Sequence, residues 1–261
     1  MSSDDKFSSR LAAQKRVDMR RVLSIDLAYT TVQNLGICLL EEDQGVLSGY
    51  NFLRPSRLGL TDPPIPAVFG EAVYRFCMDE DVRLLILDGP QGWKDPGSEL
   101  VHCRQCERIL NAPAKTGIAG QVKPANYTRF VEFSIEVFAE LVARGARLAC
   151  SPRIEPSTDR LLVLESLPLS AWRKLKILPL PAKAKATAAD CEKRFFAVAK
   201  LFGLKSTLRP SHDELQALIA GLGGVAILGG NINGYLAEGS PPFQHKGSWV
   251  EGFIVNPVIM G

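Results

Sequence analysis

The chain lacks several features that would assign it to a class at once. No apolar run approaches the roughly 20 residues that a helix needs to cross a bilayer, so no membrane span is predicted. The first 20 residues, MSSDDKFSSRLAAQKRVDMR, lack the apolar core of a secretory signal, and we expect them to form a mobile polar arm. The net charge is only +3, which neither requires nor excludes a nucleic-acid partner.

The cysteines are few and mostly isolated. Four of the six stand singly, at positions 38, 77, 150 and 191. Without a secretion signal, such cysteines indicate free thiols in a reducing compartment, and the cytoplasm is the expected location. Cys103-x-x-Cys106, preceded by His102, comes closest to a zinc motif. No second ligand pair follows it at the spacing of a zinc site, so we predict no zinc there.

The chain does contain the alternation of a globular α/β protein. A hydrophobic content of 46% and a charged content of 23% are ordinary for a folded domain. Strands are predicted over 22–28, 35–42 and 46–53, with a Gln44-Gly45 turn between the last two. A helix over 67–80 and a strand over 83–88 follow. This β-β-β-α-β order predicts a mixed sheet whose first three strands are antiparallel and whose later strands run parallel to the first.

The remainder continues the alternation, so we expect a single domain over residues 21–261. An excursion at 96–127, made of a helix over 97–111 and a loop rich in proline and glycine, should lie beside the functional site. Ser211 is expected to cap the helix that begins at His212. The other predicted elements are helices over 128–145, 169–175 and 186–203, and strands over 161–166 and 247–257.

Acidic residues end three of the predicted strands. Asp26 and Asp88 each follow an apolar run, and Glu165 stands near the end of a third. Because functional groups gather at the carboxyl ends of strands in α/β sheets, these acids and Asp213, in the first turn of a late helix, are predicted to converge. A carboxylate cluster of this kind suits Mg²⁺ or Mn²⁺ and phosphodiester cleavage. Taken singly, each acid also fits a turn, a helix cap or an ion pair.

The chain resembles the family called domain of unknown function 429, whose members are predicted ribonuclease H-like nucleases. The matching segments occur in the expected order over about residues 22–257: SIDLA (24–28), LILDGPQGW (85–93), CRQCERIL (103–110), VLESLPLSAWR (163–173), HDELQALIAGLGG (212–224) and EGFIVNP (251–257). The resemblance implies a ribonuclease H-like fold, a mixed sheet flanked by helices.

The resemblance also implies roles for the four acids as catalytic residues and metal ligands. Asp26 would be the ligand on the first strand and Asp88 the ligand at the end of the fourth. Glu165 matches the acid of the family's E-x-x-P segment, and Asp213 would complete the site from the late helix. The family often repeats an acid in D-x-x-D-A, where this chain has Gln216 and Ala217, so one or two metal ions remain possible.

Basic and aromatic residues of the excursion are candidates for binding substrate. Arg104 and Arg108 have helical i, i+4 spacing, and Lys115 and Lys123 follow in the loop. With Trp93 they would form a basic, aromatic-edged wall suited to phosphates and bases. The alternative is an ordinary solvated helix face.

Three function classes are consistent with these features of the sequence. The first is a metal-dependent nuclease acting on nucleic acid. The second is a nucleotide-binding phosphotransferase of the actin and sugar-kinase type, in which DLAYTTVQNLG would be a phosphate loop, although no second glycine-rich phosphate motif follows. The third is a nucleic-acid-binding module with no catalytic activity. Cleavage of a mixed DNA and RNA panel, compared with nucleotide binding, separates them.

Overall fold

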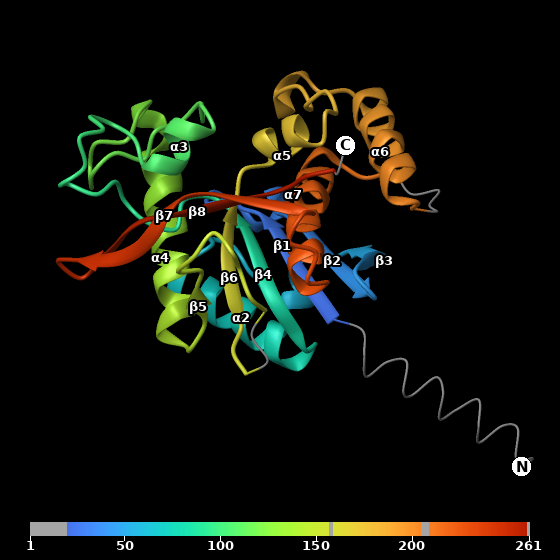
Figure 1. The fold of residues 1–261 in the computed structure, drawn as a ribbon, viewed down its shortest axis with the longest axis horizontal. Coiled ribbons are helices and arrows are strands. Elements are labelled where there is room, and N and C mark those ends of the chain that lie inside the picture. The colour runs from blue at the N-terminus through green and yellow to red at the C-terminus, as the bar shows by residue number, and fades with distance from the viewer. Residues whose placement is uncertain (1–19, 157–158, 205–208, 260–261) are drawn as a thin grey trace, which may run out of the picture.

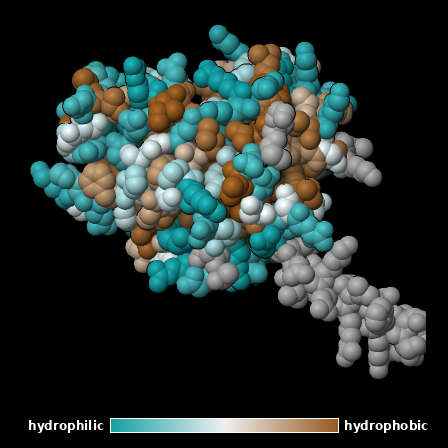
Figure 2. Space-filling model, viewed as in Figure 1, coloured by the Kyte–Doolittle hydropathy of each residue, from teal (hydrophilic) through white to brown (hydrophobic). Residues whose placement is uncertain are grey.

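The computed structural model describes residues 20–156, 159–204 and 209–259. Of the polar arm expected over 1–20, residues 1–19 lie outside the described residues. Arg20 is the first residue of the first strand. No helix in the described ranges is long and apolar enough to span a bilayer. Figure 2 shows hydrophilic residues over most of one face of the molecule, with hydrophobic residues interspersed among them.

A single mixed sheet organises the described chain (Figure 1). Its order is β3-β2-β1-β4-β6-β8-β7, and β5 pairs with β6 outside this path. The first three strands are antiparallel, whereas β4, β6 and β8 continue the sheet in parallel. The predicted ribonuclease H-like fold class is therefore confirmed. The strands are β1 (Arg20–Asp26), β2 (Gly36–Asp43), β3 (Val46–Phe52), β4 (Val82–Asp88), β5 (Arg147–Leu148), β6 (Leu162–Ser166), β7 (Tyr235–His245) and β8 (Ser248–Pro257).

Helices cover both faces of this sheet and enclose two cores. One core lies between the sheet and the helices α2 (Pro66–Asp79) and α4 (Thr128–Ala143). The other lies beneath α5 (Pro168–Lys174), α6 (Ala188–Phe202) and α7 (His212–Leu228), which Figure 1 shows grouped together. Strand residues alternate between the two cores, as the period of two in a β-strand requires.

Two predictions about secondary structure were wrong. The predicted helix over 97–111 is helical only in α3 (Gln105–Ile109), because the ammonium of Lys94 donates to the carbonyls of Asp95 and Ser98 and holds that segment in a turn. Sequence reasoning also missed β7, an edge strand that contains Pro241 and Pro242. Its pairing with β8 is irregular around these prolines, and an edge strand tolerates such residues.

The start of α7 approaches the end of β1 closely because of one glycine. Gly36 pairs with Asp26 across β1 and β2. A Cβ atom at Gly36 would lie 1.9 Å from the carbonyl oxygen of Asp213, so no larger residue fits without moving the helix. This contact brings the first turn of α7 to the same edge of the sheet as Asp26.

Candidate active site

The acids of the site lie at the carboxyl ends of neighbouring parallel strands. Asp26 on β1 is directly opposite Asp88 on β4, and Asp88 is opposite Ser166 on β6. Residues in register on adjacent strands share a face of the sheet. Glu165 is in register with Leu87 and so belongs to the other face. All four predicted acids nevertheless line one cavity of about 560 Å³ that opens at the strand ends.

Asp26 and Asp88 form a pair of adjacent carboxyl groups. Burial, reinforced by the nearby charges of Asp88 and Asp213, raises the pKa of Asp26 well above its ordinary value. Burial also raises the pKa of Asp88 to about 7, although a hydrogen bond from Asp26 partly opposes the shift. The two groups therefore share a proton near neutral pH. Among the described residues neither makes an ion pair, so their charge is not balanced by the protein in direct contact.

Asp213 lies beside this pair but has partners of its own. It stands in the first turn of α7, which Ser211 caps as predicted and Glu214 caps reciprocally. Its carboxylate pairs with the ammonium of Lys183, and its Oδ1 lies 3.1 Å from Nδ1 of His212. Burial favours a higher pKa for Asp213, but the hydrogen bonds from His212 and Lys183 outweigh it and hold the pKa below its ordinary value. Asp213 is thus an ionised carboxylate that is already paired with the ammonium of Lys183.

Glu165 is neutralised by Arg104. The guanidinium forms a two-pronged contact, with Nη1 donating to Oε2 at 2.7 Å and Nη2 donating to Oε1 at 2.6 Å. The backbone N–H of Gln91 also donates to Oε2. Burial raises the pKa of Glu165, and the Arg104 charge opposes that shift. A ligand role for Glu165 stays a prediction, and it requires Arg104 to release a carboxylate oxygen.

The same arginine holds the excursion against the sheet. Its Nε donates to Oε1 of Glu107 at 3.0 Å, and Glu107 also accepts from Thr116. Glu251 on β8 accepts the backbone N–H groups of Asp95 and Gln105, each at 3.0 Å. These buried carboxylates fix the excursion beside the cavity.

The predicted basic wall is not assembled as one surface. Arg104 lines the cavity, but its side chain is only 2% exposed and is committed to Glu165 and Glu107. Arg108 is exposed outside it, while Lys115 donates to the carbonyl of Ala112 and Lys123 contacts His102.

The aromatic member of that wall also lies elsewhere. Trp93 packs beside Val122, Val131 and Ile135, and it lines a different groove, which opens toward Trp249. The substrate-binding roles of these residues stay predictions. Of the five, only Arg104 lines the cavity that contains the acids.

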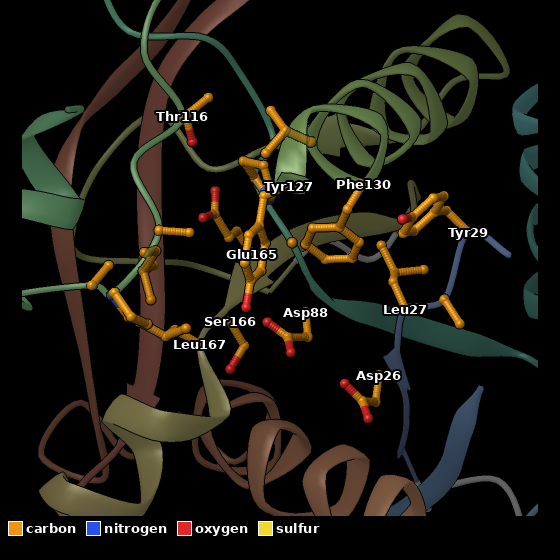
Figure 3. A pocket seen from close by; sticks show the side chains of 18 of the residues that line it. Asp26, Leu27, Tyr29, Asp88, Thr116, Tyr127, Phe130, Glu165, Ser166 and Leu167 are labelled. Carbon is orange, nitrogen blue, oxygen red and sulfur yellow. The ribbon is translucent and has the colours of Figure 1, made fainter. Parts of the chain in front are cut away.

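Aromatic residues that sequence reasoning did not single out line the cavity instead. Tyr29 follows β1, Tyr127 is the N-cap residue of α4, and Phe130 lies in the first turn of that helix. Figure 3 shows these rings on one side of the cavity and the carboxyl groups of Asp26 and Asp88 on the other. No periodicity signalled them, because they stand in a loop and at a helix start.

Other residues of the site were missed for a similar reason. Lys183 belongs to a short 3-10 turn (Lys183–Lys185), far from Asp213 in sequence, and only the fold brings its ammonium to that carboxylate. Ser166 immediately follows Glu165, yet it is Ser166 that shares a face with Asp88.

Gln216 stands where the family that the chain resembles often has a second acid, and it accepts a hydrogen bond of 2.7 Å from Nε1 of Trp172. That position therefore stabilises the packing of α5 on α7.

The cavity offers a divalent cation two adjacent carboxyl groups, those of Asp26 and Asp88. Within residues 20–156, 159–204 and 209–259, no three His, Cys, Asp or Glu side chains converge closely enough to hold a metal ion. Mg²⁺ commonly uses only one or two protein carboxylates and completes its shell with water and substrate phosphate. The adjacent carboxyl groups of Asp26 and Asp88, half-buried and without a protein cation in contact, fit that mode. Neither Cys103 nor Cys106 lines the cavity, and Cys106 is buried against Leu110 and Ile254.

No protein-family model matches the chain, and no curated protein matches it. The resemblance to domain of unknown function 429 therefore stays a prediction. Among solved structures, Thermus thermophilus RuvC in complex with a Holliday junction substrate is 13% identical, with a TM-score of 0.32, over 80% of this chain and 91% of that one. A second Thermus thermophilus RuvC structure is also 13% identical, with a TM-score of 0.34, over 80% and 92% of the two chains. Similarity at this level carries no conclusion about activity.

Proposed function

We propose that this protein is a nuclease that uses Mg²⁺ or Mn²⁺ to hydrolyse phosphodiester bonds in nucleic acid. The carrying observation is the pair Asp26 and Asp88, whose carboxyl groups meet in a cavity without a contacting protein cation. An uncompensated acid pair costs stability unless it holds a proton or a cation. A divalent cation bound between the two carboxyl groups would explain why such a pair stands at the strand ends.

Asp26 and Asp88 would hold the cation directly. Asp213 lies close enough to raise the pKa of Asp26, so its negative charge would favour the same cation from a short distance. Once bound, the cation would supply Lewis-acid stabilisation of the negative charge that develops on the phosphoryl oxygens. The proton shared by Asp26 and Asp88 must leave when the cation binds, because ligand carboxylates are ionised.

Glu165 and Arg104 would hold one wall of the cavity in place. Their two-pronged ion pair ties the end of β6 to the excursion that forms one wall of the cavity. If Arg104 were to move on substrate binding, Glu165 would become available as the further ligand that the sequence predicts. In the state described here, its oxygens are shielded by the guanidinium.

A phosphotransferase acting on a free nucleotide is the second candidate, because the cavity volume suits a small ligand. The loop after Asp26 argues against it. Asp62 accepts hydrogen bonds from the hydroxyl of Thr31 and the N–H of Val32, so this segment is already held in place rather than free to wrap around a phosphate.

We also propose the cytoplasm as the location, since all six cysteines are free thiols.

The deciding experiment is cleavage of a panel of single-stranded and duplex DNA and RNA, an RNA–DNA hybrid and a four-way junction, with Mg²⁺ or Mn²⁺. Wild type should cleave at least one member, and Asp88→Asn should reduce the rate at least a hundredfold. Asp79→Asn, an exposed acid at the end of α2, is the matched control for a contaminating nuclease. Equal cleavage by all three proteins, or none by wild type, would reject the proposal. Nucleotide binding without cleavage would favour the phosphotransferase.

A further inference from the structure

The wall opposite the acid pair is aromatic and accessible. Tyr29, Tyr127 and Phe130 all line the cavity. The rings of Tyr29 and Phe130 have their centroids 6.3 Å apart and are inclined by 57°. Tyr127 is 41% exposed, although a large aromatic side chain is normally more buried. Three aromatic side chains thus border the empty space of the site.

None of these rings is fully buried: Tyr29 and Phe130 pack partly against the core beneath α4, and Tyr127 is exposed. The buried face of α4 is formed by residues such as Val131, Val137 and Phe138, and neither Tyr127 nor Phe130 belongs to it. Tyr127 and Phe130 have i, i+3 spacing, which places neighbouring side chains on one surface of a helix. Figure 3 shows both rings at the border of the cavity that also contains Asp26 and Asp88. Packing accounts for part of the position of Phe130, but it does not account for the exposed ring of Tyr127, which a ligand in the cavity would cover.

The opposite end of the cavity is polar and incompletely satisfied. The hydroxyl oxygen of Ser166 is buried and has no hydrogen-bond partner among the described residues, and the residue is only 1% exposed. It lies beside Asp88, and the ring of Tyr127 reaches toward both in Figure 3. A buried hydroxyl without a protein partner leaves room for a water or for a polar group of a ligand. A suitable ligand is thus aromatic at one end and polar at the other.

We propose that the aromatic wall, defined as Tyr29, Tyr127 and Phe130, binds the base of one unpaired nucleotide and presents its phosphate to Asp26 and Asp88. This inference rests on the proposed nuclease function and narrows its substrate class to nucleic acid with an unpaired nucleotide. A cavity of about 560 Å³ has the size of a small-ligand pocket. A base within a duplex is stacked and paired, so it must leave the helix before it can enter such a pocket.

The test measures binding of a single-stranded oligonucleotide containing 2-aminopurine, whose fluorescence falls when the base stacks on an aromatic ring. Ca²⁺ replaces Mg²⁺, and a denaturing gel checks that the strand stays intact. Tyr127→Leu and Phe130→Leu each remove a ring but keep an apolar side chain. Phe243→Leu on β7 is the matched control, because Phe243 is 42% exposed and does not line the cavity. Circular dichroism melts confirm that each variant is folded.

We expect wild type and Phe243→Leu to bind the single strand equally and to quench its fluorescence. Each cavity variant should bind roughly tenfold more weakly, as loss of one stacking ring implies, with less quenching. A fully paired duplex should bind at least tenfold more weakly than the single strand. Equal binding by all four proteins, or equal binding of duplex and single strand, would overturn the inference.

Two further outcomes separate this inference from the proposed function. If the strand binds with quenching but no panel member is cleaved, the base site stands and the nuclease function fails. If single strands are cleaved but both cavity variants bind and cleave like wild type, the nuclease function stands and the base site fails. If 2-aminopurine nucleoside monophosphate binds as tightly as the oligonucleotide, the ligand is a free nucleotide and the polynucleotide substrate is rejected.

Discussion

Two sets of acids, one buried and one half-buried, stand at the ends of adjacent strands in this protein, and they differ in how their charge is balanced. Glu165 is held by two hydrogen bonds from Arg104, which also pairs with Glu107. Asp26 and Asp88 contact each other instead, and burial raises the pKa of both. A strand-end acid with a built-in arginine can anchor structure. Under the proposed function, a pair of acids without such an arginine would accept a cation from solution.

The largest effect should follow from removing the built-in cation. Arg104→Met leaves Glu165 and Glu107 buried without their partner, and loss of one member of a buried ion pair costs about 3–5 kcal/mol of stability. Urea denaturation of wild type and variant measures the difference. Arg108→Met, at an exposed position of the same short helix, should change stability by less than about 0.5 kcal/mol. A loss below about 1 kcal/mol for Arg104→Met would contradict the structural role of the arginine.

The acid pair should respond to an added cation. Mn²⁺ at a hundred times its dissociation constant should stabilise wild type by about 3 kcal/mol. Asp26→Asn should abolish that gain, yet leave the metal-free protein as stable as wild type or more stable, because it removes repulsion between carboxyl groups. Thermal melts with and without Mn²⁺ measure both effects. The absence of a metal-induced shift in wild type, together with a collapsed melting temperature in the variant, would mean that Asp26 is a structural residue.

The pH dependence of stability should also distinguish the acid pair. The pKa of Asp88 is about 7 in the folded protein and about 4 in an unfolded chain. Between these values the folded state binds more protons than the unfolded state, so stability falls as the pH rises through this window. We expect metal-free wild type to lose roughly 2 kcal/mol more than Asp88→Asn between pH 5 and pH 8. Urea denaturation in EDTA measures this; parallel profiles would show that Asp88 is not protonated in the folded state.

The smallest predicted effect concerns Lys183. It pairs with an acid of the site, as Arg104 does, but the pair is not buried. Its ammonium pairs with Asp213 but is half exposed, so the pair contributes little to stability. Because this charge also repels a divalent cation near Asp26, Lys183→Met should strengthen Mn²⁺ binding a few-fold, measured by calorimetry. Lys185→Met, exposed in the same turn, should leave the affinity nearly unchanged. Weaker Mn²⁺ binding by Lys183→Met would show that the lysine supports the site instead.

Patterns of apolar residues and caps were sufficient for most of the fold. The apolar runs before Asp26 and Asp88 became β1 and β4, and the Ser211 cap marked the start of α7. These signals are local, so the sequence displays them directly. The prediction failed over 97–104 and in β7, where backbone conformation depends on distant partners such as Glu251 and the pairing with β8.

The sequence by itself determined that acids would stand at the ends of neighbouring strands, because the β-β-β-α-β order and each strand's last residue are local properties of the chain. Only the tertiary structure decided which acids act together. The register places Asp26, Asp88 and Ser166 on one face and Glu165 on the other, since a shift of one residue along a strand reverses the side chain. The counter-ions were likewise decided by folding. Arg104 and Lys183 come from segments remote in sequence, and a charge pairs with whichever opposite charge the fold brings within reach.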